Sequence, residues 1–494
     1  MAEETETPAA GAAAAQPATL LDQILVQGKL ARDETQRGYA RDLVDEFITS
    51  VLAESGGTVP GDVVAAINDR IAQIDELISN QLNEVLHHPD LQKLEASWRG
   101  FAYLVFNTET GTKLKLRLLN VTKSELLKDL EKAVEFDQSV LFKKVYEDEY
   151  GTFGGLPFST LIGDYEFGRH PQDMALLEKL SNVAAAAHAP FISGAAPMLF
   201  DMAGFTELGV PRDLAKIFES AELIKWRSFR DSEDSRYVTL CLPHVLLRLP
   251  YGPKTVPVEG VGFVEDTDGR DHKKYLWGNP AWILGQRITN AFAHYGWTAA
   301  IRGVEGGGKV EGLPTHTFRT DEGDIALKCP TEIAITDRRE KELNDLGFVT
   351  LVHCKNTDYA AFFGGQTTNK PKLYNTAAAN ANSRLSAMLP YILNASRFAH
   401  YIKVIMRDKI GSFMTKENVQ SYLNTWIVDY VLAKDDAGQD IKAEYPLREA
   451  RVDVTDIPGK PGSYKAVVFL RPHFQLEELT ASIRLVAELP APAA

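Results

Sequence analysis

Residues 448–472, REARVDVTDIPGKPGSYKAVVFLRP, alternate apolar and polar side chains before a break that is rich in proline and glycine. Before the break the apolar residues are Ala450, Val452 and Val454, and a second apolar run follows it from Tyr464 to Leu470. A period of two on one side of such a break, with a further apolar run behind it, is typical of a β-hairpin. The stretch therefore predicts two antiparallel strands.

A third apolar pattern lies closer to the C-terminus. Ile483, Leu485 and Leu489 fall opposite polar residues and predict a last strand. A strand in this position leaves backbone groups unpaired along at least one edge, and proteins either cover such an edge or use it to bind another chain. Burial would stabilise each apolar side chain by roughly 1.5–3 kcal/mol. The pattern alone is compatible with a strand inside this subunit and with a strand that binds a neighbour.

The composition is that of a globular protein, and the length suggests roughly three domains. The chain has 494 residues, 45% of them hydrophobic, and a formal net charge of −14, which argues against sequence-independent binding of nucleic acid. Its three cysteines lie far apart without paired spacing, so no disulfide framework or cysteine zinc site is indicated. The acidic, alanine-rich N-terminus lacks the features of a signal peptide, and prolines interrupt the most apolar window. We expect a soluble, cytoplasmic protein without direct membrane insertion.

Three regions are predicted along the chain. Residues 1–60 form a flexible arm with short helices, 61–370 form an α/β core domain, and 371–494 form a C-terminal domain of helices and strands. In the core we expect strands at 161–167, 191–193, 237–242 and 348–354, and helices at 171–188, 211–221, 279–295 and 337–347, the last capped by Asp337. In the C-terminal domain we expect helices at 376–410, interrupted at Pro390, and at 417–432. The fold class is therefore α/β, or mixed α+β, with at least partly parallel pairing.

A heptad-like row of apolar residues runs through 64–85. Its members are Val64, Ile67, Ile71, Ile74, Ile78 and Val85, with Gln81 the one polar member. Such a row needs a partner helix, and the sequence does not say whether that helix lies in this chain or in another.

The α/β core invites an enzyme hypothesis, but the phosphate-loop candidate is incomplete. Gly303, Gly308 and Lys309 follow most of the pattern, whereas Val310 stands where a hydroxyl should bind magnesium. No helix is expected to follow, so no helix N-terminus would face a phosphate. We expect a flexible surface loop over 305–312.

Other polar groups are also weak as sites. Glu166, Arg169 and His170 follow a predicted strand, where α/β active sites often lie, but an ordinary salt-bridged loop is the alternative. Adjacent histidines at 87 and 88 point apart and lack a third ligand. A mixed cluster contains Arg227, Arg230, Asp231, Glu233, Asp234 and Arg236. Its charges of both signs suit a polar network or a subunit contact better than catalysis, and we expect no catalytic residue, cofactor or metal.

Four strings carry a family resemblance: HHPDL at 87–91, DYEFGRHP at 164–171, KWRSFRDSEDSRY at 225–237 and LPHVLLRLPYG at 242–252. They resemble the large subunit of the type VI secretion system contractile sheath, the TssC/VipB family. The similarity extends from about residue 60 to the C-terminus, and the acidic N-terminus is not part of it. The resemblance implies a contractile-sheath fold, with the α/β region followed by C-terminal helices and an interlocking domain of hairpin and strand.

The resemblance implies a mechanical function rather than a chemical one. Proteins of this family pair with a small sheath subunit of the TssB/VipA type, and the heterodimers polymerise around an inner tube of Hcp rings. The sheath grows in the bacterial cytoplasm from a membrane-anchored baseplate, and its contraction propels tube and spike into a target cell. A ClpV-type AAA+ ATPase then acts on the contracted form. Neighbouring large subunits are further partners.

By the same analogy, particular residues acquire expected roles. The strands that interlock subunits would carry Val452, Val454, Val467, Phe469, Ile483, Leu485 and Leu489. Glu477 and Glu478 would face the tube, and the cluster 227–236 would supply polar contacts that exchange on contraction. A phage-tail-like or extracellular contractile sheath remains an alternative that shares the same C-terminal logic, and an α/β metabolic enzyme is the less favoured one.

Overall fold

The computed structural model describes residues 33–54, 63–320, 322–355, 357–409, 415–434, 436–458 and 464–473. Two compact units are present. The first comprises the described residues up to 83 together with 252–264, and the second comprises 84–251 and the described residues from 265 onward. No helix within these ranges is both long enough and apolar enough to cross a membrane.

The first unit contains α2 (Arg37–Glu54) and most of α3 (Val63–Leu86), which continues into the second unit. The loop 252–264 contacts α3, because the amide of Gly262 donates to the Asp75 carboxylate at 3.2 Å. Phe263 of the same loop is buried. The loop 252–264 therefore belongs to the helical N-terminal unit although it is distant in sequence.

A six-stranded mixed sheet forms the centre of the second unit. Its order is β1 (Leu161–Phe167), β2 (Phe191–Ala195), β3 (Val238–Leu242), β9 (Phe348–His353), β10 (Tyr359–Phe362) and β6 (Lys309–Glu311). The first four strands are parallel, and β10 is antiparallel to both β9 and β6. The predicted α/β class with partly parallel pairing is confirmed.

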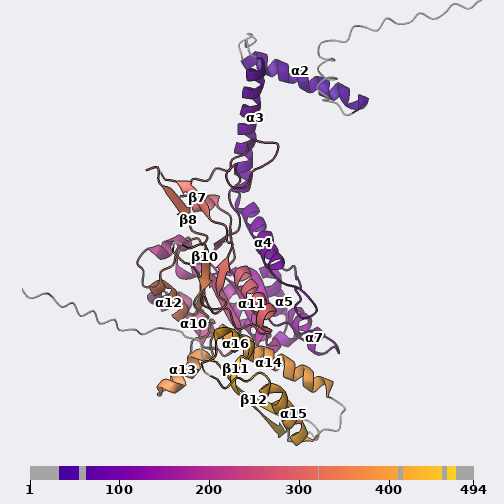
Figure 1. Ribbon diagram of the computed structural model, residues 1–494, viewed down its shortest axis with the longest axis vertical. Coiled ribbons are helices and arrows are strands. Elements are labelled where there is room, and N and C mark those ends of the chain that lie inside the picture. The colour runs from indigo at the N-terminus through magenta and orange to yellow at the C-terminus, as the bar shows by residue number, and fades with distance from the viewer. Residues whose placement is uncertain are drawn as a thin grey trace, which may run out of the picture. The chain divides into compact units, whose positions relative to one another are not determined.

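Helices cover both faces of this sheet, and Figure 1 shows α11 among them. Side chains of β3 alternate between two apolar clusters: Leu240 lies in the cluster with α8 (Pro171–Ala187), and Cys241 lies in the cluster with α11 (Ala281–Tyr295). This alternation follows from the period of two along a strand. Because both faces are buried, the central strands are almost continuously apolar.

Further helices and strands belong to the region before the C-terminal helices. The helices are α4 (Pro89–Phe106), α5 (Lys123–Lys132), α6 (Val140–Phe142), α7 (Asp148–Tyr150), α9 (Leu214–Phe218), α10 (Ile224–Asp231) and α12 (Asp337–Asp345), and a π-helical turn at Lys143–Glu147 joins α6 to α7. Two small antiparallel pairs are β4 (Val245–Leu246) with β5 (Trp277–Gly278) and β7 (His316–Arg319) with β8 (Ile325–Lys328).

The C-terminal part forms its own apolar cluster. It contains α13 (Ala377–Leu385), α14 (Leu389–Asp408), α15 (Lys416–Val428), α16 (Gln439–Glu444) and the hairpin of β11 (Leu447–Asp456) with β12 (Tyr464–Pro472). Figure 1 shows the last three helices gathered around this hairpin. Trp297 stacks on Phe398 of α14 with ring centroids 4.4 Å apart, and Leu423 of α15 joins the same cluster. The predicted hairpin is confirmed, with Val452 opposite Val468.

Several local predictions need correction. The predicted helix at 211–221 contains only the short α9 and a 3-10 turn at Ala221–Leu223. Helix α12 is capped by the hydroxyl of Thr336, which accepts from the Arg339 amide at 3.4 Å, and Asp337 is its first residue. The helical region 376–410 is interrupted at 386–388, and Pro390 occupies the first turn of α14, where proline is tolerated.

The predicted surface loop at 305–312 is also corrected. Residues 309–311 form β6, which pairs with β10, and Val310 is fully buried. The glycines before β6 favoured the prediction of a loop. The strand itself depends on pairing with β10, which lies about fifty residues further along the chain.

Candidate assembly surface

The inner face of the hairpin packs on the chain's own helices. Val452 and Val454 are 0% and 2% exposed and lie in one cluster with Leu423 and Ile427 of α15. Their side chains therefore contribute to this subunit's core. That the strand they belong to binds another subunit stays a prediction.

The outer face of the hairpin carries exposed apolar side chains. Val467 and Phe469 of β12 are 53% and 48% exposed. Across the ladder they stand opposite Asp453 and Arg451, which pair with each other at 3.0 Å. An apolar pair beside an ion pair is thus presented to solvent on a rigid two-stranded support.

The outer edge of β11 is closed by side chains from α15. Asn424 accepts from the Val452 amide at 2.9 Å and donates to the Val452 carbonyl at 2.8 Å, and Gln420 accepts from the Val454 amide at 3.3 Å. These amide side chains bind the backbone as a neighbouring strand would. No further strand can pair along this edge without displacing them.

The outer edge of β12 has a different environment. In an antiparallel ladder, residues whose backbone groups point away from the partner face each other across the pair. The backbone N–H groups of Val452 and Val454 point toward α15. Their partners Val468 and Ala466 therefore direct their own N–H and C=O groups away from β11. Within the described residues, no group pairs with these outward N–H and C=O groups. The hairpin is therefore open on the β12 side, as far as the described chain extends.

The remaining predicted C-terminal contacts lie outside the described residues. They are Ile483, Leu485 and Leu489 of the last predicted strand and the two tube-facing candidates Glu477 and Glu478.

The mixed-charge cluster separates into internal and exposed members. Arg230 is 7% exposed, and its Nε donates to the Thr368 carbonyl at 2.8 Å. Burial lowers the pKa of this guanidinium to about 10. Arg227 donates to the carbonyls of Phe218 and Ser220 at 2.8 and 2.6 Å. These two arginines bind loops of their own subunit.

The other members of the cluster are more accessible. Asp231 and Glu233 are exposed, and Glu233 pairs with Lys372 at 3.5 Å. Asp234 and Arg236 are half-buried. A role in contacts that exchange between subunits stays a prediction, and the exposed carboxylates suit it best.

Those members of the predicted heptad row whose side chains the structure describes are exposed along α3, and the side chains of Val64 and Ile67 lie outside the described part. Ile71, Ile74 and Ile78 of the first unit are all exposed, as is Val85 further along. Apolar residues in a regular helical row are rarely left in water. The helix therefore presents a second apolar surface.

The strand-end trio does not converge on a site. Glu166 accepts from His244 at 2.8 Å, Arg169 binds Asp201 and Glu222, and His170 caps α8. His244 could not be recognised from the sequence as part of this group, because its second partner, Glu332 at 2.6 Å, is distant along the chain.

His244 forms a charged group whose side chain is only 17% exposed. Burial alone would lower the pKa of its imidazole, but the hydrogen bonds to Glu166 and Glu332 outweigh this effect and raise the pKa to about 10. The protonated ring donates from both nitrogens and has no lone pair left to act as a base. The group is suited to holding the ends of β1 and β3 together, not to catalysis.

The other enzyme candidates also take structural roles. His88 caps α4, with Pro89 as the first helical residue as predicted, and His87 lies 3.3 Å from Glu265. Lys309 pairs with Glu311 in β6 and lies over the ring of Tyr359. No group of three or more possible metal ligands occurs in the described ranges.

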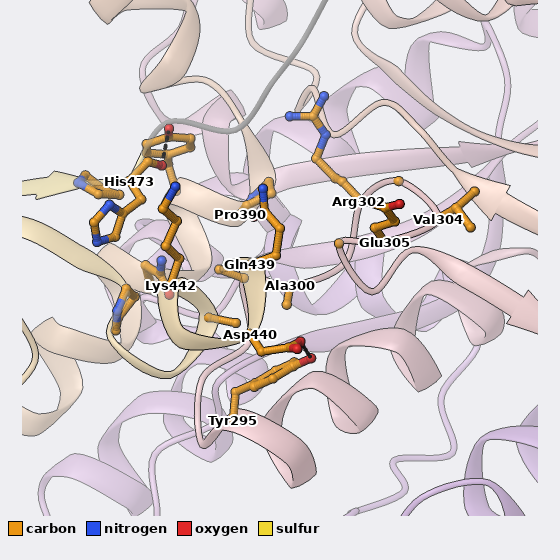
Figure 2. A pocket seen from close by; sticks show the side chains of 18 of the residues that line it. Tyr295, Ala300, Arg302, Val304, Glu305, Pro390, Gln439, Asp440, Lys442 and His473 are labelled. Carbon is orange, nitrogen blue, oxygen red and sulfur yellow. Dashed lines mark hydrogen bonds between the residues drawn. The ribbon is translucent and has the colours of Figure 1, made fainter. Parts of the chain in front are cut away.

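A depression of about 500 Å³ lies beside the end of the hairpin, and Figure 2 shows its side chains. The Tyr295 hydroxyl donates to Asp440 at 2.8 Å, and Arg302, Glu305 and Lys442 bring further charges of both signs. Among the described residues that line it there is no serine, threonine or cysteine. The alcohol and thiol side chains that most often act as activated nucleophiles are therefore absent from the described lining.

Comparison with known proteins identifies relatives. Residues 68–369 match the family model of the EvpB/VC_A0108 tail sheath N-terminal domain, and 378–489 match that of its tail sheath gpW/gp25-like domain. The type VI secretion system sheath protein TssC1 of Pseudomonas aeruginosa is 48% identical over 490 residues, which cover 99% of this chain and 98% of that protein.

Solved structures give weaker likenesses. The baseplate of the anti-feeding prophage matches with a TM-score of 0.38 and 11% identity, covering 76% of this chain and 83% of that one. The contracted PVC sheath complex, an extracellular contractile injection system, matches with a TM-score of 0.33 and 8% identity, covering 62% and 68%.

Proposed function

The chain belongs to the EvpB/VC_A0108 tail sheath family and is a structural subunit of a type VI secretion sheath, and from this premise we propose that it pairs with a small sheath subunit of the TssB/VipA type and polymerises around an Hcp inner tube. The proposal is supported above all by the hairpin, which has one edge closed by its own helix and one edge that no described residue pairs with. An open edge on a rigid support is a ready site for strand addition.

The open edge of β12 receives a terminal strand of a neighbouring subunit. Val467 and Phe469 supply apolar contacts for that strand or its neighbour, and the predicted strand with Ile483, Leu485 and Leu489 completes the shared sheet. Each backbone hydrogen bond contributes about 0.5–1.5 kcal/mol. Several such bonds in register form a joint that persists while the lattice tilts.

The exposed row on α3 receives a helix of the small subunit. Ile71, Ile74 and Ile78 have the spacing of a coiled-coil seam, and their exposure supports a partner outside the described chain. This contact holds the heterodimer together independently of the shared sheet.

Other contacts change on contraction. The exposed carboxylates of Asp231 and Glu233 form ion pairs with neighbouring large subunits and exchange them, because a hydrated ion pair contributes only about 0–1 kcal/mol. Glu477 and Glu478 face the inner tube. The subunit catalyses no reaction of its own.

The assembly takes place in the bacterial cytoplasm on a membrane-anchored baseplate. A ClpV-type AAA+ ATPase acts on the contracted sheath. The net charge of −14 and the weak enzyme candidates support a role without nucleic acid, cofactor or metal.

Co-expression with the small subunit, followed by negative-stain electron microscopy, tests the proposal. The wild-type pair forms long tubes. Phe469→Asp and Leu485→Asp leave the heterodimer soluble but abolish long tubes. Ile325→Asp serves as a matched control, because Ile325 is an exposed strand residue on the separate β7–β8 hairpin. Discrete particles from the wild-type pair under all conditions, or full-length tubes from both variants, would contradict the shared sheet.

A further inference from the structure

A second strand-like segment, residues 112–120, lies between α4 and α5. It has neither helix nor ladder pairing, and burial alternates over 113–117: Lys113, Lys115 and Arg117 are exposed, whereas Leu114 and Leu116 are half-buried, and 118–120 are exposed throughout. A period of two is the pattern of an extended chain with one side on the protein. The segment therefore resembles a strand that has no partner strand.

The segment 112–120 has a local turn at its start and is anchored to the core at Arg117 and just beyond its end. At its start, the Gly111 amide donates to the Leu114 carbonyl at 2.9 Å. Arg117 pairs with Glu149 and lies 5.2 Å from the centre of the Phe158 ring. Just after the segment, the Val121 carbonyl accepts from Tyr165 of β1 at 2.7 Å. The segment is thus positioned before any partner arrives, which lowers the entropic cost of binding.

The backbone of this segment is available. Across 115–120, no backbone hydrogen bond to any described residue is formed. Leu118 and Leu119 are exposed large apolar residues at its end. Unpaired backbone groups beside exposed leucines are the features of an edge that accepts another strand.

The positive charge of the segment 112–120 indicates the kind of strand that would bind it. Within the described ranges no carboxylate pairs with Lys113 or Lys115, although the chain as a whole carries a net charge of −14. Cations that alternate with leucines are complementary to a strand in which acidic residues alternate with apolar ones.

We propose that residues 112–120 form a second strand-addition site, distinct from the hairpin, which binds an extended segment of another sheath subunit that alternates acidic and apolar residues. This inference rests on the proposed assembly with a second kind of subunit. It adds a joint on the α/β core, so that two separate regions of the large subunit are linked by backbone pairing.

The binding test uses the full chain and a fluorescent peptide that alternates glutamate and valine. Fluorescence anisotropy measures its affinity. Lys113→Glu combined with Lys115→Glu weakens binding about tenfold, because two exposed ion pairs are replaced by repulsion. The matched control, Lys128→Glu with Lys132→Glu, makes the same charge change on exposed residues of α5 and leaves affinity within about twofold.

A peptide of the same composition, with its glutamates and valines in separate blocks, distinguishes pairing from simple charge attraction. The alternating peptide binds more tightly. Equal binding of the two peptides, or equal weakening by the two double variants, overturns the proposal.

Hydrogen exchange then locates the contact in the assembly. In the chain alone, the amides of 115–120 exchange rapidly, and in tubes formed with the small subunit they are protected. Unprotected amides in intact tubes overturn this second site while leaving the sheath function standing. Protection in the isolated chain that rises with its concentration assigns the edge to a second copy and overturns the proposed partner. Absence of tubes from the wild-type pair refutes the proposed function, and the peptide experiment still decides the site.

Discussion

The two faces of the hairpin allow a matched test with a single type of substitution. Val452→Ala removes buried methyl groups from the cluster with α15, whereas Val467→Ala removes methyl groups that are half in water. The lost transfer free energy and the remaining cavity cost about 2 kcal/mol at Val452. At Val467 the corresponding cost is below about 0.5 kcal/mol. The lower strand propensity of alanine affects both variants and largely cancels in the comparison.

Hydrogen exchange of the amides that join β11 to β12 measures this difference locally. Because about 1.4 kcal/mol corresponds to a factor of ten, Val452→Ala accelerates exchange about thirtyfold when the hairpin opens. Val467→Ala changes it less than about threefold, yet shortens the tubes formed with the small subunit. Equal acceleration by both variants, or a larger effect at Val467, would refute the assignment of inner and outer faces.

Three further predictions address other parts of the chain. His244→Gln lowers the free energy of unfolding near neutral pH by at most about 5 kcal/mol, because the pKa of His244 is raised from 6.5 to about 10 in the folded state. The contribution of His244 is complete below pH 6.5 and is lost as the pH rises to 10. Denaturation midpoints of wild type and variant that fail to converge over this range contradict the prediction. Ile74→Glu leaves the circular dichroism spectrum unchanged but reduces co-purification of the small subunit at least about tenfold, and full recovery of the pair counts against the α3 contact. Arg230→Met lowers the free energy of unfolding in urea by roughly 3 kcal/mol, because the Thr368 carbonyl loses its buried donor. Arg230→Lys does not restore the lost stability, since lysine lacks the guanidinium geometry. An unchanged urea midpoint would show that this contact is dispensable.

Features set by local pattern could be predicted from the sequence. The hairpin follows from alternation around a proline and glycine break, and Figure 1 shows it as β11 and β12. The row on α3 follows from its heptad spacing, and its exposure agrees with the need for a partner. In both cases the signal lies within one continuous segment, where periodicity is directly readable.

Features set by distant partners could not be predicted. The edge of β11 is closed by Asn424 and Gln420, and no pattern in the strand itself reveals this. His244 was overlooked because Glu166 and Glu332 lie 78 and 88 residues away. The short strand β6 was taken for a loop because its pairing partner β10 and the core cluster that buries Val310 come from other parts of the chain. Tertiary pairing decides each of these features, and one sequence does not contain that information in readable form.

The side-chain amides of Asn424 and Gln420 from α15 limit the number of hairpin edges that can pair with another strand. A bare two-stranded ribbon could grow from both borders, and copies of it could stack without limit into fibres. With Asn424 and Gln420 occupying one border, the described hairpin can be extended only along β12. A hairpin closed on this border cannot stack through it with the hairpin of another copy, which limits edge-to-edge aggregation of the isolated subunit.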